Sequence, residues 1–333
     1  MKETRKRQME FEALRGLSII LLLSLHSEIY DPIVFGETLK HIGFFVASFL
    51  LGSFFFLAGY FTETSLHKPG QTIFAFAWSK FVRIYPPYWL ALFLFVSYIG
   101  VSLKRTDMVV YVMNLQAVFS PVFVKQVLTL WYISMLVVFY LLFGVVMFSV
   151  RSSAGLAIAS VAVYGAAYGA NQAWGLFDPR FFQYYFIFLA GVFFCRFGEA
   201  RKKLFDLNPF VKILAAVISV FPLQWILNNS KTEGAFYLLA VDFFILAWIL
   251  CALTLFRTRI GDWNIWLWLS TASYFTYLIH RPLWHLMDSF IGLEPGMGTV
   301  YVHLTAGAVL ALLLGYFLQR GYDRLLMFIG LKC

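Results

Sequence analysis

Long apolar runs, broken by short polar stretches, occupy most of this chain. A helical run of roughly 20 apolar residues matches the hydrocarbon core of a bilayer. About ten runs approach this length, so the pattern predicts an all-α, polytopic integral membrane protein with both termini on one side. The predicted spans cover about residues 14–29, 43–61, 85–103, 128–149, 154–171, 181–197, 211–228, 235–256, 265–284 and 299–319.

Three polar residues interrupt the first span. Arg15 and His26 are eleven residues apart, close to three helical turns, so they share one face about 16 Å apart. Glu12 lies one turn before Arg15 and can pair with it. Because such a stripe is costly in lipid, it should face protein or water, as one wall of a polar tunnel. The alternative is that Arg15 snorkels at the inner edge and His26 lies among headgroups.

The positions of the basic residues orient this topology. With the N-terminus inside, most of the 26 Lys and Arg residues fall at inner ends and loops, which agrees with the positive-inside rule. We therefore expect cytoplasmic termini and a single membrane domain over residues 1–333. Its basic N-terminus is 1–10, its outer loop 104–127 and its cytoplasmic tail 320–333. The first span lacks a small-residue cleavage site and is expected to be retained.

Composition narrows the class further. Charged residues make up 13% of the chain and hydrophobic residues 61%, whereas soluble domains carry about 25% charged residues. The net charge of +9 fits cytoplasmic loops, so no nucleic-acid partner is predicted. Neither the three cysteines nor the six histidines have metal-site spacing, and no metal or bound cofactor is expected.

Two further segments carry candidate chemistry. Lys80 and Arg83 share a helix face and could bind phosphate, although basic residues and aromatics at a boundary are ordinary membrane anchors. His280 is expected near the depth of His26, or else is an ordinary hydrogen-bonded interfacial residue. Arg281, directly before Pro282, is expected to end that span.

Taken in order, these segments resemble the membrane-bound acyltransferase-3 family. The first span resembles that family's first helix, with its Arg, ten residues, and then His. The later segments are similar to its second-helix, basic-Pro-aromatic, Trp-containing and Tyr-Leu-His-x-Pro motifs. The matching stretches are ALRGLSIILLLSLH, FFFLAGYF, KFVRIYPPYWLAL, LWYISMLVVFYLL and SYFTYLIHRPLW.

The resemblance implies a multi-pass O-acyltransferase of the bacterial inner membrane. Such proteins commonly move an acetyl group from acetyl-CoA, as co-substrate, to a hydroxyl of a surface polysaccharide or other glycan. Arg15 and His26 match the family's essential pair, and Arg83 its basic loop residue. Two departures stand out: Lys80 replaces the first Arg of the Arg-x-x-Arg motif, and residues 134–137 lack the acid that many members carry.

These expectations combine into a mechanistic hypothesis. The phosphates of acyl-CoA would lie near Arg83, Lys80 and Arg15, with the thioester pointing toward His26. His26 would act as general base on a carbohydrate hydroxyl or carry the acyl group transiently. Glu12 would orient Arg15. Three wall residues would complete the site: His280, Trp131 and Tyr277.

Two rival functions remain open from the sequence. An intramembrane Arg and His also suit a transporter or flippase of a glycan or lipid precursor, which would not need CoA. A structural partner of a glycan-assembly complex would tolerate the loss of His26. In each case the expected partners include membrane lipids, and the sequence predicts no particular oligomeric state.

Overall fold

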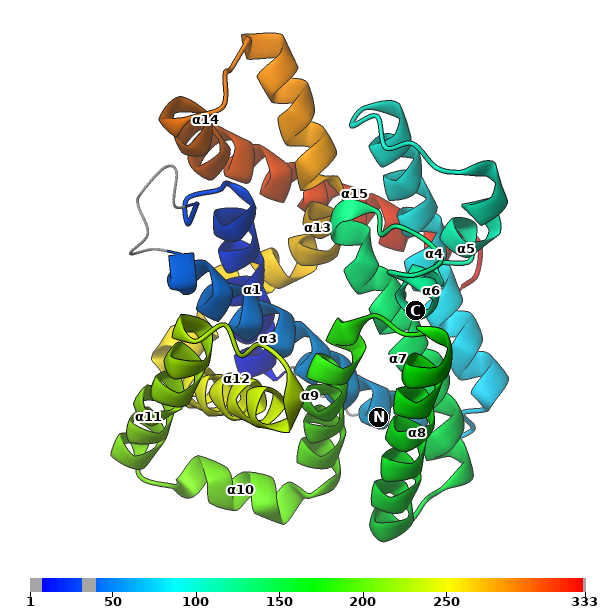
Figure 1. The fold of residues 1–333 in the computed structure, drawn as a ribbon, viewed down its shortest axis with the longest axis vertical. Helices are drawn as coiled ribbons and strands as arrows, with labels where there is room; N and C mark the ends of the chain where they lie inside the picture. Colours follow the sequence, from blue (N-terminus) through cyan, green and yellow to red (C-terminus); the bar gives the residue numbers. More distant parts are fainter. Residues whose placement is uncertain (1–7, 32–39, 332–333) are drawn as a thin grey trace. The chain divides into compact units, whose positions relative to one another are not determined.

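The computed structural model describes residues 8–31 and 40–331 (Figure 1). Over these ranges the secondary structure is helical, and the described residues contain no strand, which confirms the all-α prediction. The first seven residues of the predicted basic N-terminus, and Lys332 and Cys333 of the predicted tail, lie outside the described residues.

The helices gather into two compact units. The first contains residues up to 54 and from 202 on, and the second residues 55–201. The first unit holds α1 (Met9–His26), the start of α3 (Lys40–Leu66), α11 (Pro209–Asn228), α12 (Gly234–Phe256), α13 (Asn264–Ile291), α14 (Met297–Val302) and α15 (Ala308–Phe328). The second holds the rest of α3, α4 (Ile73–Ser97), α5 (Met108–Val112), α6 (Gln116–Phe119), α7 (Trp131–Ser149), α8 (Ser153–Trp174) and α9 (Pro179–Arg196), while α10 (Gly198–Asp206) crosses the boundary.

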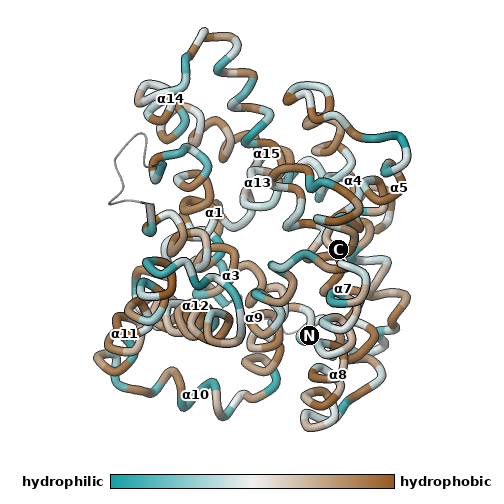
Figure 2. The backbone as a smooth tube through the Cα atoms, in the orientation of Figure 1, coloured by the Kyte–Doolittle hydropathy of each residue, from teal (hydrophilic) through white to brown (hydrophobic). Residues whose placement is uncertain are grey.

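Within the described residues, six helical segments are long and apolar enough to cross a membrane. They are His41–Leu66, Leu128–Ser149, Ser153–Trp174, Pro209–Asn228, Gly234–Phe256 and Met297–Phe328. A seventh is possible where α9 continues into α10 across a 98° bend, and most of these helices are coloured hydrophobic in Figure 2. The protein is therefore a multi-pass membrane protein. The other predicted spans lie on α1, α4 and α13, so the count of ten stays a prediction.

Helices α4 and α13 each run through prolines that lie near a predicted boundary of a span. Helix α4 begins at Ile73, where the Thr72 side chain caps it by accepting from the Ala75 amide, and it runs through both Pro86 and Pro87. Helix α13 continues past Pro282 to Ile291, so the helix does not end at Arg281, and the end of the membrane span there stays a prediction. A proline removes one intrahelical hydrogen bond, which a long helix packed by its neighbours tolerates.

Glycines let helices approach closely within each unit. In the second unit, a Cβ on Gly59 would lie 2.0 Å from the carbonyl oxygen of Phe188, and one on Gly191 2.0 Å from that of Phe56. In the first unit, Gly52 packs against Ile245, where an added Cβ would meet the side chain at 2.3 Å. These are backbone or side-chain contacts that a methyl group would prevent, as the small-residue pattern of membrane helices predicts.

Candidate active site

Helices α1 and α13 pack side by side and run in the same direction. Arg15 of α1 contacts Ser270 of α13, and eleven residues further on His26 contacts His280, ten residues after Ser270. Because these two spacings differ by a single residue, the two helices stay side by side in nearly the same register over about 16 Å. The polar stripe predicted on the first span therefore faces protein, and its partner is α13.

Arg15 belongs to a polar cluster near the start of α1. Its Nη1 lies 3.7 Å from Glu12 Oε2 and 3.3 Å from Ser270 Oγ, and the Ser270 hydroxyl donates to Glu12. The predicted pairing of Glu12 with Arg15 is therefore present. The Arg15 side chain is 31% exposed, so its charge reaches accessible space.

His26 and His280 form a directly hydrogen-bonded pair of imidazoles. Nδ1 of His26 lies 2.7 Å from Nε2 of His280, the ring planes are within 2°, and the centroids are 4.9 Å apart. These three values describe coplanar rings joined end to end by a well-aligned hydrogen bond. His280 is completely buried, whereas His26 is only partly buried and forms the accessible member of the pair.

The backbone of α13 determines where the protons of this pair lie. Nδ1 of His280 is 3.1 Å from the carbonyl oxygen of Thr276 and 2.9 Å from that of Tyr277. Carbonyl oxygens only accept, so Nδ1 of His280 carries a proton, and in the neutral ring Nε2 is the acceptor. His26 must then donate from Nδ1, which leaves the lone pair on its Nε2.

This arrangement makes His26 a suitable base. Its Nε2 can accept a proton, and the resulting imidazolium keeps its Nδ1–H bond to His280. His26 also lies in the last turn of α1, where the helix dipole favours positive charge. The site can therefore take up a proton without rearranging the pair.

Aromatic side chains surround His280. The Tyr277 ring centroid is 6.2 Å away, and Trp284 meets the imidazole edge to face at 5.4 Å. The His303 ring stacks on Trp284 with the centroids 4.5 Å apart, and its Nε2 lies 2.9 Å from Asp288 Oδ1. His303 begins a π-helical turn between α14 and α15, a local irregularity that often marks functional sites. Sequence reasoning gave Trp284, His303 and Asp288 no role, because their separation along the chain hides their contact.

The remaining candidates from the sequence lie in the second unit. Arg83 is exposed on α4, whereas the Lys80 ammonium lies 4.1 Å from the centre of the Tyr140 ring and 5.3 Å from that of Phe76. The indole of Trp131 is covered by the Arg180 guanidinium at 3.8 Å. Within the described residues, then, the first unit places Glu12 and Arg15 at one end of the α1–α13 contact, and His26, His280 and Tyr277 at the other end.

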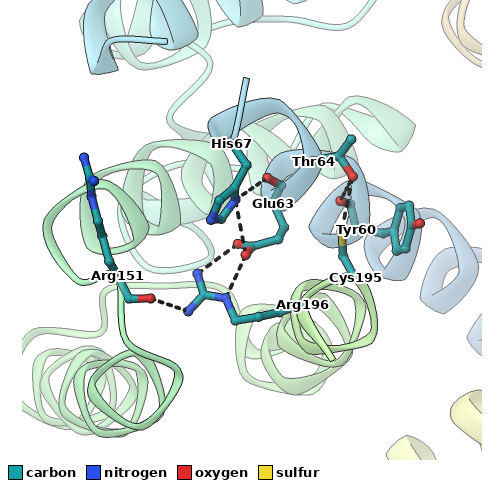
Figure 3. Close-up of polar contacts among 7 residues, drawn as sticks. All are labelled: Tyr60, Glu63, Thr64, His67, Arg151, Cys195 and Arg196. Carbon is teal, nitrogen blue, oxygen red and sulfur yellow. Dashed lines mark hydrogen bonds and ion pairs between the residues drawn. The ribbon is translucent and has the colours of Figure 1, made fainter. Parts of the chain in front are cut away.

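The second unit also contains a charged cluster that the sequence did not indicate (Figure 3). Glu63, near the end of α3, is 3% exposed and accepts two hydrogen bonds from the Arg196 guanidinium, at 2.7 and 3.1 Å. The same guanidinium donates to the backbone carbonyl of Arg151. His67, one turn after Glu63, contacts its carboxylate at 3.4 Å. This cluster ties the ends of α3 and α9 together.

The described residues thus form a helical, multi-pass membrane protein in which two histidines, His26 and His280, are joined by a hydrogen bond between α1 and α13. The model of a family described as an acyltransferase domain, the acyltransferase-3 family, matches residues 10–320. The chain belongs to this family, and the match covers both compact units. The resemblance carried by the ordered motifs is thereby confirmed, and the protein is an acyltransferase. Comparisons with curated proteins and with solved structures gave no match.

Proposed function

We propose that this protein is an integral membrane O-acyltransferase of the bacterial inner membrane, which transfers an acetyl group from acetyl-CoA to a hydroxyl of a surface polysaccharide or other glycan. Family membership supports acyl transfer. The observation that carries the proposal is the His26–His280 hydrogen bond, because it leaves Nε2 of a partly buried imidazole available as a base.

In the proposed reaction, the acceptor hydroxyl gives its proton to Nε2 of His26 as its oxygen attacks the thioester carbon. A positioned base of this kind contributes about 10²–10⁴-fold to a rate. Collapse of the tetrahedral intermediate breaks the C–S bond, and His26 returns the proton to the sulfur of CoA. The products are the acetylated glycan and CoA.

Three basic residues are proposed to bind the donor. Arg83 is exposed, and its guanidinium can donate two parallel hydrogen bonds to a phosphate. Lys80 and Arg15 would add positive charge. Glu12 orients Arg15 through the contacts described above. Each binding role predicts that substitution raises the KM for acetyl-CoA more than it lowers kcat.

The test uses inverted membrane vesicles that contain the full-length protein, labelled acetyl-CoA and the native glycan acceptors. Vesicles with the wild-type protein should label the glycan fraction, and vesicles with His26→Ala should lose at least about 100-fold of that activity. Mass spectrometry of surface glycans from strains with and without the gene identifies the acceptor and the acyl mass. Undiminished labelling by His26→Ala would refute the base role.

A transporter or flippase of a glycan precursor is the contrasting outcome of the same experiment. Such a protein would change the sidedness of the glycan but would not need acetyl-CoA. Unchanged acyl mass on all surface glycans, with loss of glycan export, would favour it.

We further propose the ten-span arrangement with both termini in the cytoplasm. The parallel direction of α1 and α13 suits this arrangement, since the first and ninth spans must cross in the same direction. Cysteine-accessibility labelling at loop 104–127 and at α10 tests it. Loop 104–127 should react with an impermeant thiol reagent from outside the cell, and α10 only from inside.

A further inference from the structure

Trp284 of α13 carries a buried hydrogen-bond donor that does not stabilise the fold. The residue is 3% exposed, and its Nε1 has no hydrogen-bond partner among the described residues. A buried N–H without an acceptor lowers stability, and the indole nitrogen usually finds a partner when it is buried. A purely apolar side chain would fill this space without that cost, so the indole needs an explanation other than packing.

Two histidines contact the indole of Trp284. His280, one turn earlier on α13, has its ring centroid 5.4 Å away, with the ring planes at 84°. His303 stacks on the indole with the centroids 4.5 Å apart and the planes within 11°. Nε2 of His303 lies 2.9 Å from Oδ1 of Asp288, one turn after Trp284 on the same helix. The indole therefore contacts both the buried member of the imidazole pair and a second histidine that a carboxylate holds.

The segment before α15 packs closely against the same indole. Gly307 ends the π-helical turn that His303 begins, and a Cβ there would lie 2.7 Å from Nε1 of Trp284 and 3.0 Å from its Cδ1. Leu23 of α1 and Ala311 of α15 are buried in one apolar cluster with Trp284. Close packing of this kind leaves a large side chain few alternative rotamers, so the indole is held in one orientation.

The orientation of the His280 ring decides whether its hydrogen bond to His26 forms. Nε2 of His280 accepts from Nδ1 of His26 only while its lone pair, which lies in the ring plane, points at that proton. The χ2 torsion of histidine has a broad intrinsic preference, so neighbouring groups must select the ring orientation. An immobile ring in contact with the imidazole can make this selection.

We propose that Trp284 is a positioning residue for the imidazole pair: its indole, held by His303 and Asp288, fixes the ring plane of His280 and thereby keeps the proton of His26 on Nδ1. This inference rests on the proposed acyltransferase function, although Trp284 itself need touch neither substrate nor the reacting atoms. While Nδ1 of His26 is protonated, the lone pair stays on Nε2, the atom that takes the acceptor proton. A rotated His280 ring would lose the hydrogen bond, and neutral His26 would then carry its proton on either nitrogen.

The experiment compares three variants of the full-length protein with the wild type. Trp284→Leu removes the ring, so kcat for labelled acetyl transfer in inverted vesicles should fall about 10-fold to 100-fold. The KM for acetyl-CoA should change less than about threefold, because the donor site is untouched. Trp284→Phe keeps a ring and should retain more of kcat. His303→Gln keeps a donor for Asp288 but cannot stack, so it should show a smaller loss.

Nitrogen-15 shifts of labelled histidine supply a measurement that general destabilisation does not move. In wild-type protein His26 should be protonated on Nδ1, whereas in Trp284→Leu its proton should be shared between both ring nitrogens. The spectrum of His26→Ala assigns the signals. Leu223→Ala, fully buried on α11 of the same unit, is the control for lost packing. It should melt at a lower temperature but keep the wild-type kcat and the wild-type His26 shifts.

The two measurements decide between a positioning role and a structural one. Loss of kcat together with movement of the His26 proton, in Trp284→Leu and to a smaller extent in His303→Gln, supports positioning. Wild-type His26 shifts in Trp284→Leu overturn it, whatever the rate. If Trp284→Leu does not fold, unchanged His26 shifts in His303→Gln overturn it instead. Failure of the wild-type protein to transfer acetyl groups would refute the proposed function separately, because the shifts report on Trp284 without any turnover.

Discussion

Arg15 Nη1 lies 3.3 Å from Ser270 Oγ, at the opposite end of the α1–α13 contact from the imidazole pair. Ser270 also donates to Glu12, so one hydroxyl links both members of the ion pair to α13. Gly16, the next residue, lets the backbones approach: a Cβ there would lie 3.1 Å from side-chain atoms of Leu269 and Trp266. These contacts join α1 to α13 three turns away from the imidazole pair.

This link predicts the effect of Ser270→Ala. The substitution leaves Glu12 and Arg15 without their shared partner, so the Arg15 guanidinium should sample more orientations. We expect a roughly threefold to tenfold rise in the KM for acetyl-CoA, equivalent to about 0.7–1.4 kcal/mol of binding free energy, with kcat within twofold of the wild type. Initial rates in inverted vesicles measure it. Ser289→Ala, on the exposed end of the same helix, is the control. An unchanged KM would show that Ser270 has no part in donor binding.

His280→Phe tests the tautomer argument. Phenylalanine fills the buried space but accepts no hydrogen bond, so Nδ1 of His26 would lose its partner and the proton could move to Nε2. We expect kcat to fall about 100-fold, with a small change in KM, as expected for a group that orients a general base. Nitrogen-15 chemical shifts of labelled histidine report which ring nitrogen of His26 carries the proton.

The control for this variant is His285→Phe, an exposed position on the same helix. It should keep wild-type activity and wild-type shifts for His26. A His280→Phe variant in which His26 is still protonated on Nδ1, and kcat is unchanged, would remove His280 from the mechanism.

Part of this site was predictable from the sequence. The 3.6-residue period gave the shared face of Arg15 and His26, and the position of His280 in its span indicated a similar depth. Which ring nitrogens of His26 and His280 carry protons could not be predicted from the sequence. These positions depend on the carbonyl oxygens of Thr276 and Tyr277, which His280 Nδ1 contacts. The full length of α13 was missed because Pro282 was interpreted as marking a boundary, whereas the helix continues for nine more residues.

The fold, too, could be predicted from the sequence only in part. Apolar runs located the long helices, since burial in lipid leaves a strong compositional signal. Helix α4 begins earlier than predicted, because its first turns carry Lys80 and Arg83, which lower the apolarity that the prediction follows. Contacts such as Glu63–Arg196 join residues 133 positions apart, and no local pattern reports them.

Gly59→Ala should destabilise the second unit. The added methyl would lie 2.0 Å from the Phe188 carbonyl oxygen, and because that atom is backbone, α3 and α9 must separate. Overpacking of this kind costs about 1–3 kcal/mol or more. Thermal unfolding in detergent, followed by size-exclusion chromatography, should show a melting temperature several degrees lower.

The matched control is Gly165→Ala on α8, where an added Cβ meets nothing within 4 Å. Replacing an unhindered helical glycine stabilises by about 0.5–1 kcal/mol, so this variant should melt at or above the wild-type temperature. Equal melting temperatures for the two variants would mean that α3 and α9 do not pack through Gly59.

The Glu63–Arg196 ion pair predicts a non-additive pair of substitutions (Figure 3). Glu63 is 3% and the Arg196 side chain 10% exposed, so removing one partner strands a buried charge, at a cost of about 3–5 kcal/mol. We expect Glu63→Met and Arg196→Met each to lower the melting temperature strongly, and the double variant to recover most of the loss, because an apolar pair leaves no charge uncompensated. A double variant as unstable as the sum of the single variants would show that the two residues act separately. His67, 63% exposed, should contribute little, so His67→Gln is the control.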